Sequence, residues 1–109
     1  MEALLLVPMD RALQLDAEFD RFLEENPHVF RRFRHLAVKL KAKGIERYGA
    51  KSLWEVLRWQ LAVETNADAK SFRLNNNYVS RMARKLMRDE PEDFAGFFEL
   101  RSLKGGEPD

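Results

Sequence analysis

The sequence contains no cysteine, and its five glycines form no glycine-rich loop. The absence of cysteine excludes disulfides, thiolate nucleophiles and cysteine-ligated zinc, and it fits a reducing compartment. Without a glycine-rich loop, the chain has no recognisable phosphate cradle. The N-terminal MEALLLVP has a short apolar run and no preceding basic residue. We therefore expect neither a signal peptide nor a membrane span, and we expect a cytoplasmic protein.

Patterns typical of catalysis or metal binding are also scarce. His28 and His35 lie on one predicted helix without matching carboxylates, so we expect no metal site there. Four acidic residues around Pro91 could bind a divalent ion, as in a small nuclease, although capping of the turn explains them better. They are Asp89, Glu90, Glu92 and Asp93. We expect no enzyme and no cofactor, with a small metal-dependent nuclease as the alternative.

The composition is that of a folded domain, with 45% hydrophobic and 11% aromatic residues. A chain of 109 residues has room for one core. We expect a single globular domain over residues 1–103 and a disordered tail, KGGEPD, over 104–109. Charged residues make up 34% of the chain, and arginine outnumbers lysine, a weak indication of a thermophilic source.

Apolar residues at helical spacing dominate the first half of the chain. Asp10 or Asp16 can cap a first helix, and Asn26 and Pro27 predict the boundary to the next, with Asn26 as its N-cap. In the first helix, apolar residues at approximate helical spacing are Leu13, Leu15, Phe19, Phe22 and Leu23. The second helix, over 27–43, would end at Gly44. Its apolar face is expected to consist of Val29, Phe33, Leu36, Ala37 and Leu40.

The second half of the chain begins with a capping box, Ser52 to Glu55, which predicts a helix over 52–65. This helix is apolar around most of its circumference, so we expect it to be the central buried helix, with Trp54 and Trp59 packed in the core. A loop over 66–75, with a short strand at 71–74, leads to a helix over 77–90. After Pro91 the chain must fold back to complete the core, as a helical turn or as strands, with Phe94, Phe97, Phe98 and Leu100.

These elements predict a mainly α fold, a compact domain of about four helices. The order of a buried helix, a connection and a basic helix also admits a helix-turn-helix or winged-helix-like arrangement with a small C-terminal β wing. Arg101 and Lys104 would then lie near backbone phosphates of a bound duplex.

Charge is segregated along the chain although the formal net charge is only +1. Residues 1–27 carry −5, 28–58 carry +7, 59–69 carry −2, 70–88 carry +6 and 89–109 carry −5. The two basic blocks coincide with predicted helices, so we expect one positively charged face.

The helix over 77–90 carries the sharpest of these signals. A helix that enters a DNA groove needs cations for phosphates and short polar side chains near its N-terminus for base edges. The cations are Arg81, Arg84, Lys85 and Arg88, with no acid among them, and the polar side chains are Asn75, Asn76, Asn77 and Ser80. Turn formation and helix capping explain consecutive asparagines equally well. Both interpretations stay open.

A second basic stripe lies on the helix over 27–43. Its members are Arg32, His35, Lys39 and Lys43, and it could either contact a partner or be solvated.

Several short segments between Phe19 and Arg101 carry a resemblance to a known family. They are Asn26-Pro27-His28-Val29, Arg58-Trp59, Glu64-Thr65, Asn75-Asn76-Asn77, Ala83-Arg84, Met87, and Gly96-Phe97-Phe98-Glu99 with Arg101. Together they resemble an uncharacterised family of small phage and prophage proteins. The resemblance implies a viral or prophage source, and hence the host-cell cytoplasm. It implies no activity, cofactor or catalytic residue.

Two functional hypotheses follow. The first is a phage-encoded accessory DNA-binding protein that places the helix over 77–90 against double-stranded DNA. The second is a small protein that binds a host or phage protein, as an inhibitor or assembly factor, through its segregated acidic and basic faces. The apolar LLLV at residues 4–7 could add an apolar contact or the seam of a homodimer.

Overall fold

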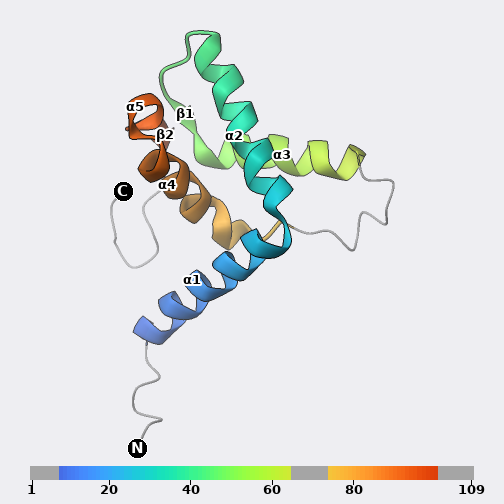
Figure 1. The fold of residues 1–109 in the computed structure, drawn as a ribbon, viewed down its shortest axis with the longest axis vertical. Helices are drawn as coiled ribbons and strands as arrows, with labels where there is room; N and C mark the ends of the chain where they lie inside the picture. Colours follow the sequence, from blue (N-terminus) through green and yellow to red (C-terminus); the bar gives the residue numbers. More distant parts are fainter. Residues whose placement is uncertain (1–7, 65–73, 101–109) are drawn as a thin grey trace, which may run out of the picture.

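The computed structural model describes residues 8–64 and 74–100, and within them the side chains from residue 11 onward (Figure 1). The elements are α1 (Pro8–Glu25), α2 (Pro27–Ala42), β1 (Tyr48–Gly49), α3 (Ala50–Glu64), a 3-10 turn η2 (Asn76–Tyr78), α4 (Val79–Asp89), α5 (Pro91–Phe94) and β2 (Phe98–Glu99). The predicted mainly α fold is confirmed. None of the helices in the described ranges is both long and apolar enough to cross a membrane.

The boundary between α1 and α2 lies at the predicted position and Asn26 is the N-cap residue of α2 as predicted, but its side chain bonds back to α1. Its backbone N–H and its Nδ2 both donate to the carbonyl oxygen of Phe22, at 2.8 Å and 3.1 Å, and its side chain makes no N-cap hydrogen bond to α2. Asn26 therefore ends α1, while Pro27 occupies the first turn of α2, where a missing N–H costs nothing. Because α1 begins at Pro8, before Asp10 and Asp16, the predicted caps for this helix are wrong.

The inner face of α2 is the one predicted from helical spacing, since Val29, Phe33, Leu36 and Ala37 are buried. The helix ends as expected: Gly44 has a φ of +89° and its N–H donates to the carbonyl oxygen of Lys41 at 2.9 Å.

Helix α3 begins at Ala50, directly after β1, so Ser52 lies inside the first turn rather than at the cap. The carboxylate of Glu55 binds Lys51 and Arg58 instead of reaching back along the helix. The predicted capping box is therefore wrong. Strand β1 ends at Gly49 and pairs with β2, and α3 starts directly after it at Ala50. The helix therefore begins two residues before the predicted cap at Ser52.

The C-terminal segment folds back as a helical turn and also as a strand. Pro91 starts α5, Gly96 turns the chain with a φ of 72°, and β2 pairs in parallel with β1. The N–H of Tyr48 donates to the carbonyl oxygen of Phe97 at 2.9 Å. The expected two-stranded sheet is thus present, but its other strand precedes α3, so the segment is not a hairpin wing by itself. Leu74 is buried outside any strand; residues 71–73, Arg101, Lys104 and the tail lie outside the described residues.

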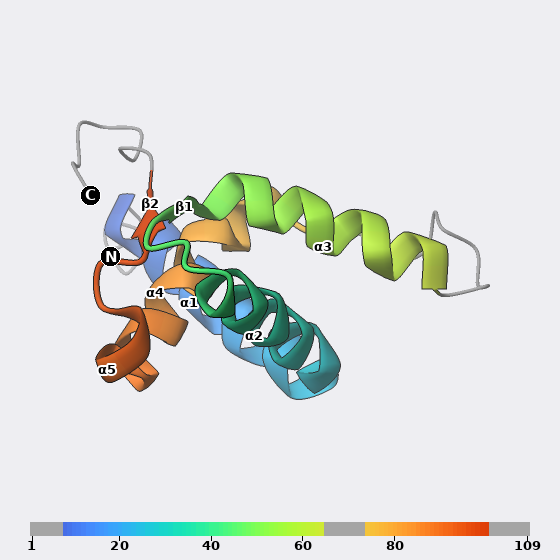
Figure 2. The same ribbon diagram turned by 90° about the horizontal axis from the view of Figure 1, so that it is seen from above.

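An aromatic cluster holds α2, α3 and the C-terminal segment together. The ring of Phe33 stacks on Phe98 with centroids 5.3 Å apart and meets Trp54 edge-on at 6.2 Å. Phe97 contacts Phe94 and Phe98 at 5.4 Å and 4.9 Å. Figure 2 shows α3 running above α2, with α4 and α5 to the left of α2, and α3 packs directly against both α2 and α4. Residues distant in sequence thus share one core.

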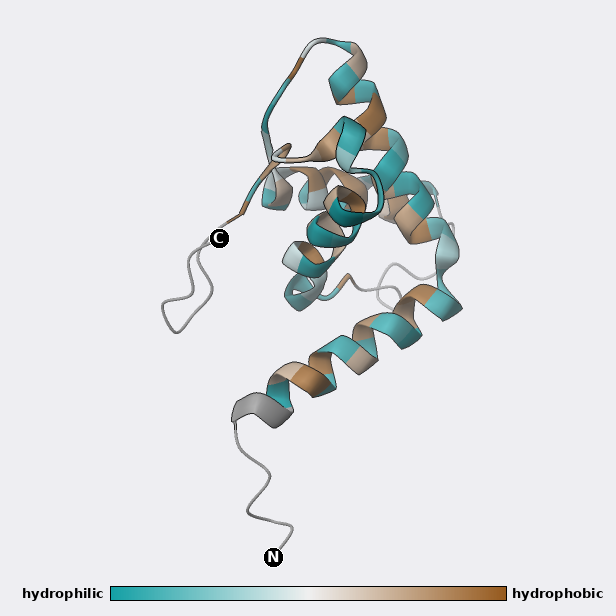
Figure 3. Ribbon diagram, turned by 60° about the vertical axis from the view of Figure 1, so that its left-hand side comes forward, coloured by the Kyte–Doolittle hydropathy of each residue, from teal (hydrophilic) through white to brown (hydrophobic). Residues whose placement is uncertain are grey.

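Helix α1 is docked by its C-terminal half. Phe19 is buried, and the rings of Phe19 and Phe22 lie 5.4 Å and 5.1 Å from the ring of Tyr78 at the start of α4. Leu13, in contrast, is 60% exposed, although it shares the helical spacing of Phe19 and Phe22. Figure 3 shows the N-terminal half of α1 standing apart from the other helices.

Candidate functional site

The three asparagines form the entry to α4. Asn75 has an extended backbone, and its Oδ1 accepts a hydrogen bond from the N–H of Asn77 at 2.8 Å, which makes Asn75 the N-cap of η2. The carbonyl oxygen of Asn75 also accepts from the N–H of Tyr78 at 2.9 Å. The turn and cap interpretation is thus confirmed for Asn75, although we had expected the helix to begin at Asn77.

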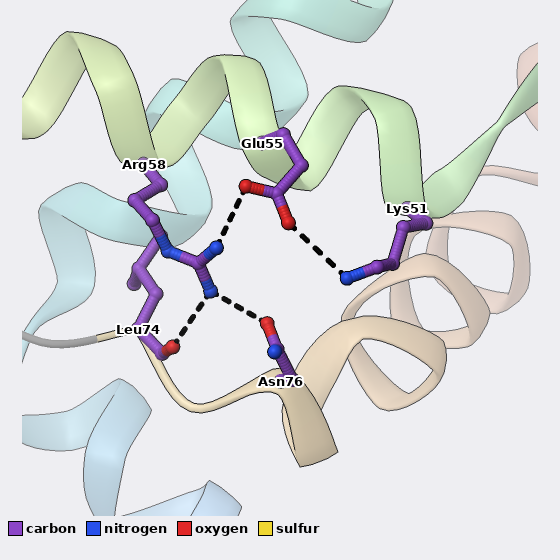
Figure 4. A network of polar contacts seen from close by, with 5 residues as sticks. All are labelled: Lys51, Glu55, Arg58, Leu74 and Asn76. Atoms are coloured by element: carbon purple, nitrogen blue, oxygen red, sulfur yellow. Dashed lines mark hydrogen bonds and ion pairs between the residues drawn. The ribbon is translucent and has the colours of Figure 1, made fainter.

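Asn76 is occupied by a contact that the sequence did not reveal. The guanidinium of Arg58 donates to Asn76 Oδ1 at 2.5 Å, to the carbonyl oxygen of Leu74 at 3.0 Å and to Glu55 Oε1 at 2.7 Å (Figure 4). Lys51 donates to the other oxygen of Glu55 at 3.1 Å. These hydrogen bonds, first that from Lys51 and then that from Arg58, lower the pKa of Glu55 below its ordinary 4.5. Arg58 therefore clamps the entry of α4 to α3.

The basic residues of α4 are partly neutralised by an acid of α1 and by the acid at the C-terminal end of α4 itself. Arg81 Nε donates to Asp16 Oδ1 of α1 at 2.7 Å, and Lys85 donates to Asp89 at 2.9 Å. Lys85 also lies over the ring of Phe30, 5.1 Å from its centroid. Arg88 is 71% exposed, and its Nε lies 3.9 Å from Asp89 Oδ1. Residues 70–88 contain no acid, but in the folded protein acids from outside this block bind basic side chains of α4.

The remaining candidates of this helix differ in exposure. Ser80 and Arg84 are half-buried and Asn77 is exposed. Because α1 packs on Tyr78 and its Asp16 binds Arg81, an acidic helix lies beside the N-terminal end of α4. A recognition helix reads bases from that end, so α1 limits how a duplex could approach it.

The second basic stripe also meets acids. Arg32 donates to Glu64 at 2.8 Å and to Gln60 at 3.2 Å, both on α3. The hydrogen bond with Glu64 raises the pKa of Arg32 and lowers that of Glu64. His35, Lys39 and Lys43 are exposed.

The opposite edge of α2 faces the C-terminal acids. Arg34 donates from Nε and NH2 to the two oxygens of Glu90, at 2.5 Å and 2.9 Å, and this fork lowers the pKa of Glu90. Lys41 lies 5.9 Å from the ring centroid of Phe94. The charge blocks that alternate along the sequence thus bind one another in space.

Metal chemistry finds no geometric support in the part of the chain that the structure describes. There, no three histidine, aspartate or glutamate side chains gather as a group that could hold an ion. Of the acids near Pro91, Glu90 binds Arg34 and Asp89 binds Lys85.

A shallow cavity of about 360 Å³ lies where the end of α1, the start of α2 and α4 meet. It is lined by Leu23, Glu24, Pro27, Phe30, Arg31 and Lys85. Its volume is near the lower end of the range for ligand pockets, and its walls are apolar with charged side chains among them.

Sequence reasoning missed the outer face of α3. The helix buries Ala50, Leu53, Trp54, Leu57 and Leu61. On the opposite side, Val56 is 38%, Trp59 65% and Val63 58% exposed; these three residues are called the α3 outer face below. The expectation of a helix buried around most of its circumference, with Trp59 in the core, is wrong. The 56–59–63 spacing, on the side opposite the other apolar positions, was the available signal.

The comparisons with known proteins add no relative. No model of a known protein family matches this chain, and searches of the curated proteins and of the solved structures find no match.

Proposed function

We propose that this chain is a small interaction protein that binds another protein through the α3 outer face. The observation that carries the proposal is the 65% exposure of Trp59 between two exposed valines on one helix face. Single exposed apolar residues are common, whereas a contiguous apolar surface is typical of protein–protein contacts. Tryptophan is also enriched among the residues that dominate binding energy.

The chemistry of this face indicates the kind of partner. The neighbouring acid, Glu55, is already bound by Lys51 and Arg58, and its pKa is lowered accordingly. Glu64, at the C-terminal end of α3, is bound by Arg32 of α2. The centre of the face is uncharged, so the partner should present an uncharged, apolar surface, as in the centre of most protein interfaces.

A viral source is proposed on the resemblance alone. The host-cell cytoplasm would then be the place of contact, and a host or phage protein the partner.

The test is capture of a partner by immobilised protein from a nuclease-treated extract of the source cell, with the parent compared to Trp59→Glu. We expect a protein that the parent retains and the variant loses, because a charge at position 59 would be desolvated on binding. Leu13→Glu is the matched control, since Leu13 is similarly exposed at 60% but lies on α1. Equal retention by the parent and Trp59→Glu would refute the proposal.

A second candidate is binding of double-stranded DNA by the outward side of α4. Its specific support is Arg88, which is 71% exposed, with Arg84 one turn before it. Replacing both by Gln should weaken binding to every DNA sequence and reduce the salt slope by about two. Parent protein that does not bind DNA at low salt, or a double variant that binds like the parent, would remove this candidate.

A further inference from the structure

We propose that the α3 outer face binds a second copy of this chain, with the two α3 helices antiparallel. The inference rests on the proposed function, because it names the occupant of the same surface. It would make the protein a weak, symmetric homodimer.

The spacing of the exposed residues fits such a pairing. Exposed Ser52 extends the α3 outer face by one turn, so the positions 52, 56, 59 and 63 are separated by four, three and four residues. This is the spacing of a coiled-coil seam. It reads the same in both directions along the helix. In an antiparallel pair, Val56 therefore meets Trp59 of the second copy, and the small Ser52 meets Val63 of the second copy.

The shape of the molecule favours the antiparallel direction. Figures 1 and 2 both show the C-terminal end of α3 projecting past α2, while the sheet and α5 lie near its N-terminal end. An antiparallel pair places the bodies of the two copies at opposite ends of the seam, whereas a parallel pair would crowd them at one end. Antiparallel helix dipoles also attract each other.

Charge does not oppose the association. The formal net charge of +1 gives little repulsion between copies. Glu55, which flanks the seam, is bound by Lys51 and Arg58 of its own chain. In this register it lies near Ala62 of the second copy, so the pairing brings no two like charges into direct contact.

The size of the face sets the strength of the dimer. A buried aromatic residue covers roughly 150–250 Å², so one tryptophan and two valines, each partly exposed, bury roughly 300 Å² per copy. The total, roughly 600 Å², is about half of what a stable interface needs. The dimer is therefore expected to be weak and to form only at high protein concentration.

Sedimentation equilibrium from roughly 20 μM to roughly 1 mM tests the association. The parent and Leu13→Glu should both shift toward the dimer at the upper end, and Trp59→Glu should stay monomeric. Trp59 is 65% exposed, so the variant should retain the fold, which its circular dichroism and thermal unfolding will verify. A parent that stays monomeric at every concentration, or a Trp59→Glu variant that dimerises like the parent, overturns the inference.

The relative direction of the two α3 helices is tested with a spin label on the Lys51→Cys variant. The introduced cysteine carries the only thiol, because the native chain has no cysteine. In the antiparallel register Lys51 lies level with Glu64 of the second copy, so the two labels should be about 20 Å apart along the helix axis. Labels level with each other would indicate parallel helices and overturn the arrangement. If the protein is monomeric but still captures a partner in a Trp59-dependent way, the homodimer fails and the proposed function stands. If neither is observed, both fail.

Discussion

Arg58→Met tests whether the clamp between α3 and the entry of α4 stabilises the fold. The substitution keeps most of the aliphatic stem, which packs against its surroundings, and removes the guanidinium. The hydrogen bonds that it deletes go to Leu74 O at 3.0 Å and Asn76 Oδ1 at 2.5 Å, and the ion pair goes to Glu55 at 2.7 Å.

The magnitude follows from the exposure of these groups. Hydrogen bonds from a charged group contribute about 1.5–3 kcal/mol each when they are shielded. The hydrogen bond to Leu74 O is part-buried, so we assign it the lower end of this range, about 1.5 kcal/mol. The contacts with Asn76 and Glu55 are exposed, and the Arg58 side chain is itself 36% exposed, so we assign these two contacts together about 0.5 kcal/mol. The free energy of unfolding should therefore fall by about 2 kcal/mol, which corresponds to a decrease in Tm of about 10 °C.

The assay is urea unfolding followed by circular dichroism, with amide hydrogen exchange of η2 as a local readout. Arg88→Met is the matched control, because the same atoms are removed from a side chain that is 71% exposed and lies 3.9 Å from Asp89. It should change the free energy of unfolding by less than about 0.5 kcal/mol. Arg58→Lys should be intermediate, since one ammonium cannot reproduce the fork. An Arg58→Met variant as stable as Arg88→Met would show that the clamp does not stabilise the fold.

Three further predictions concern the cap, the docking of α1 and pH. Asn75→Ala should lower the free energy of unfolding by about 1 kcal/mol and Asn77→Ala by clearly less, in parallel urea titrations, because the capping oxygen belongs to Asn75; equal effects would contradict this. Phe19→Ala should lower the free energy of unfolding by about 3 kcal/mol and reduce the hydrogen-exchange protection of α1, because Phe19 is only 6% exposed and packs on Tyr78. Unchanged protection would show that other residues hold α1 in place. Three carboxylates have pKa values below the ordinary 4.5, so their stabilisation is complete above that pH and is lost as the pH falls through their lowered values. They are Glu55, Glu64 and Glu90. Urea midpoints should therefore fall as the pH drops below about 5, and Arg34→Gln, which unbinds Glu90, should make this fall shallower; an equally steep fall would refute that assignment.

The sequence by itself determined that the chain is mainly helical, and it determined the inner faces of α2 and α4. Local preferences are sufficient for this, because an apolar stripe at helical spacing has to be buried and Pro27, Gly44 and Pro91 act on their own backbone. The buried face of α4 was also predictable, since Tyr78, Val79, Met82, Ala83 and Leu86 lie on one side of the helix.

Only the tertiary structure decided how the charges and the polar caps are used. Asp16 and Arg81 are 65 residues apart in sequence, and Arg34 and Glu90 are 56 apart. A pattern along the chain shows that opposite charges exist, but it cannot show which of them meet, because the meeting depends on how α1 and the C-terminal segment fold back. For the same reason the sequence could not assign Asn76 to Arg58. It also could not show which side of the doubly apolar α3 remains exposed, since that depends on how many neighbouring elements are available to cover the helix.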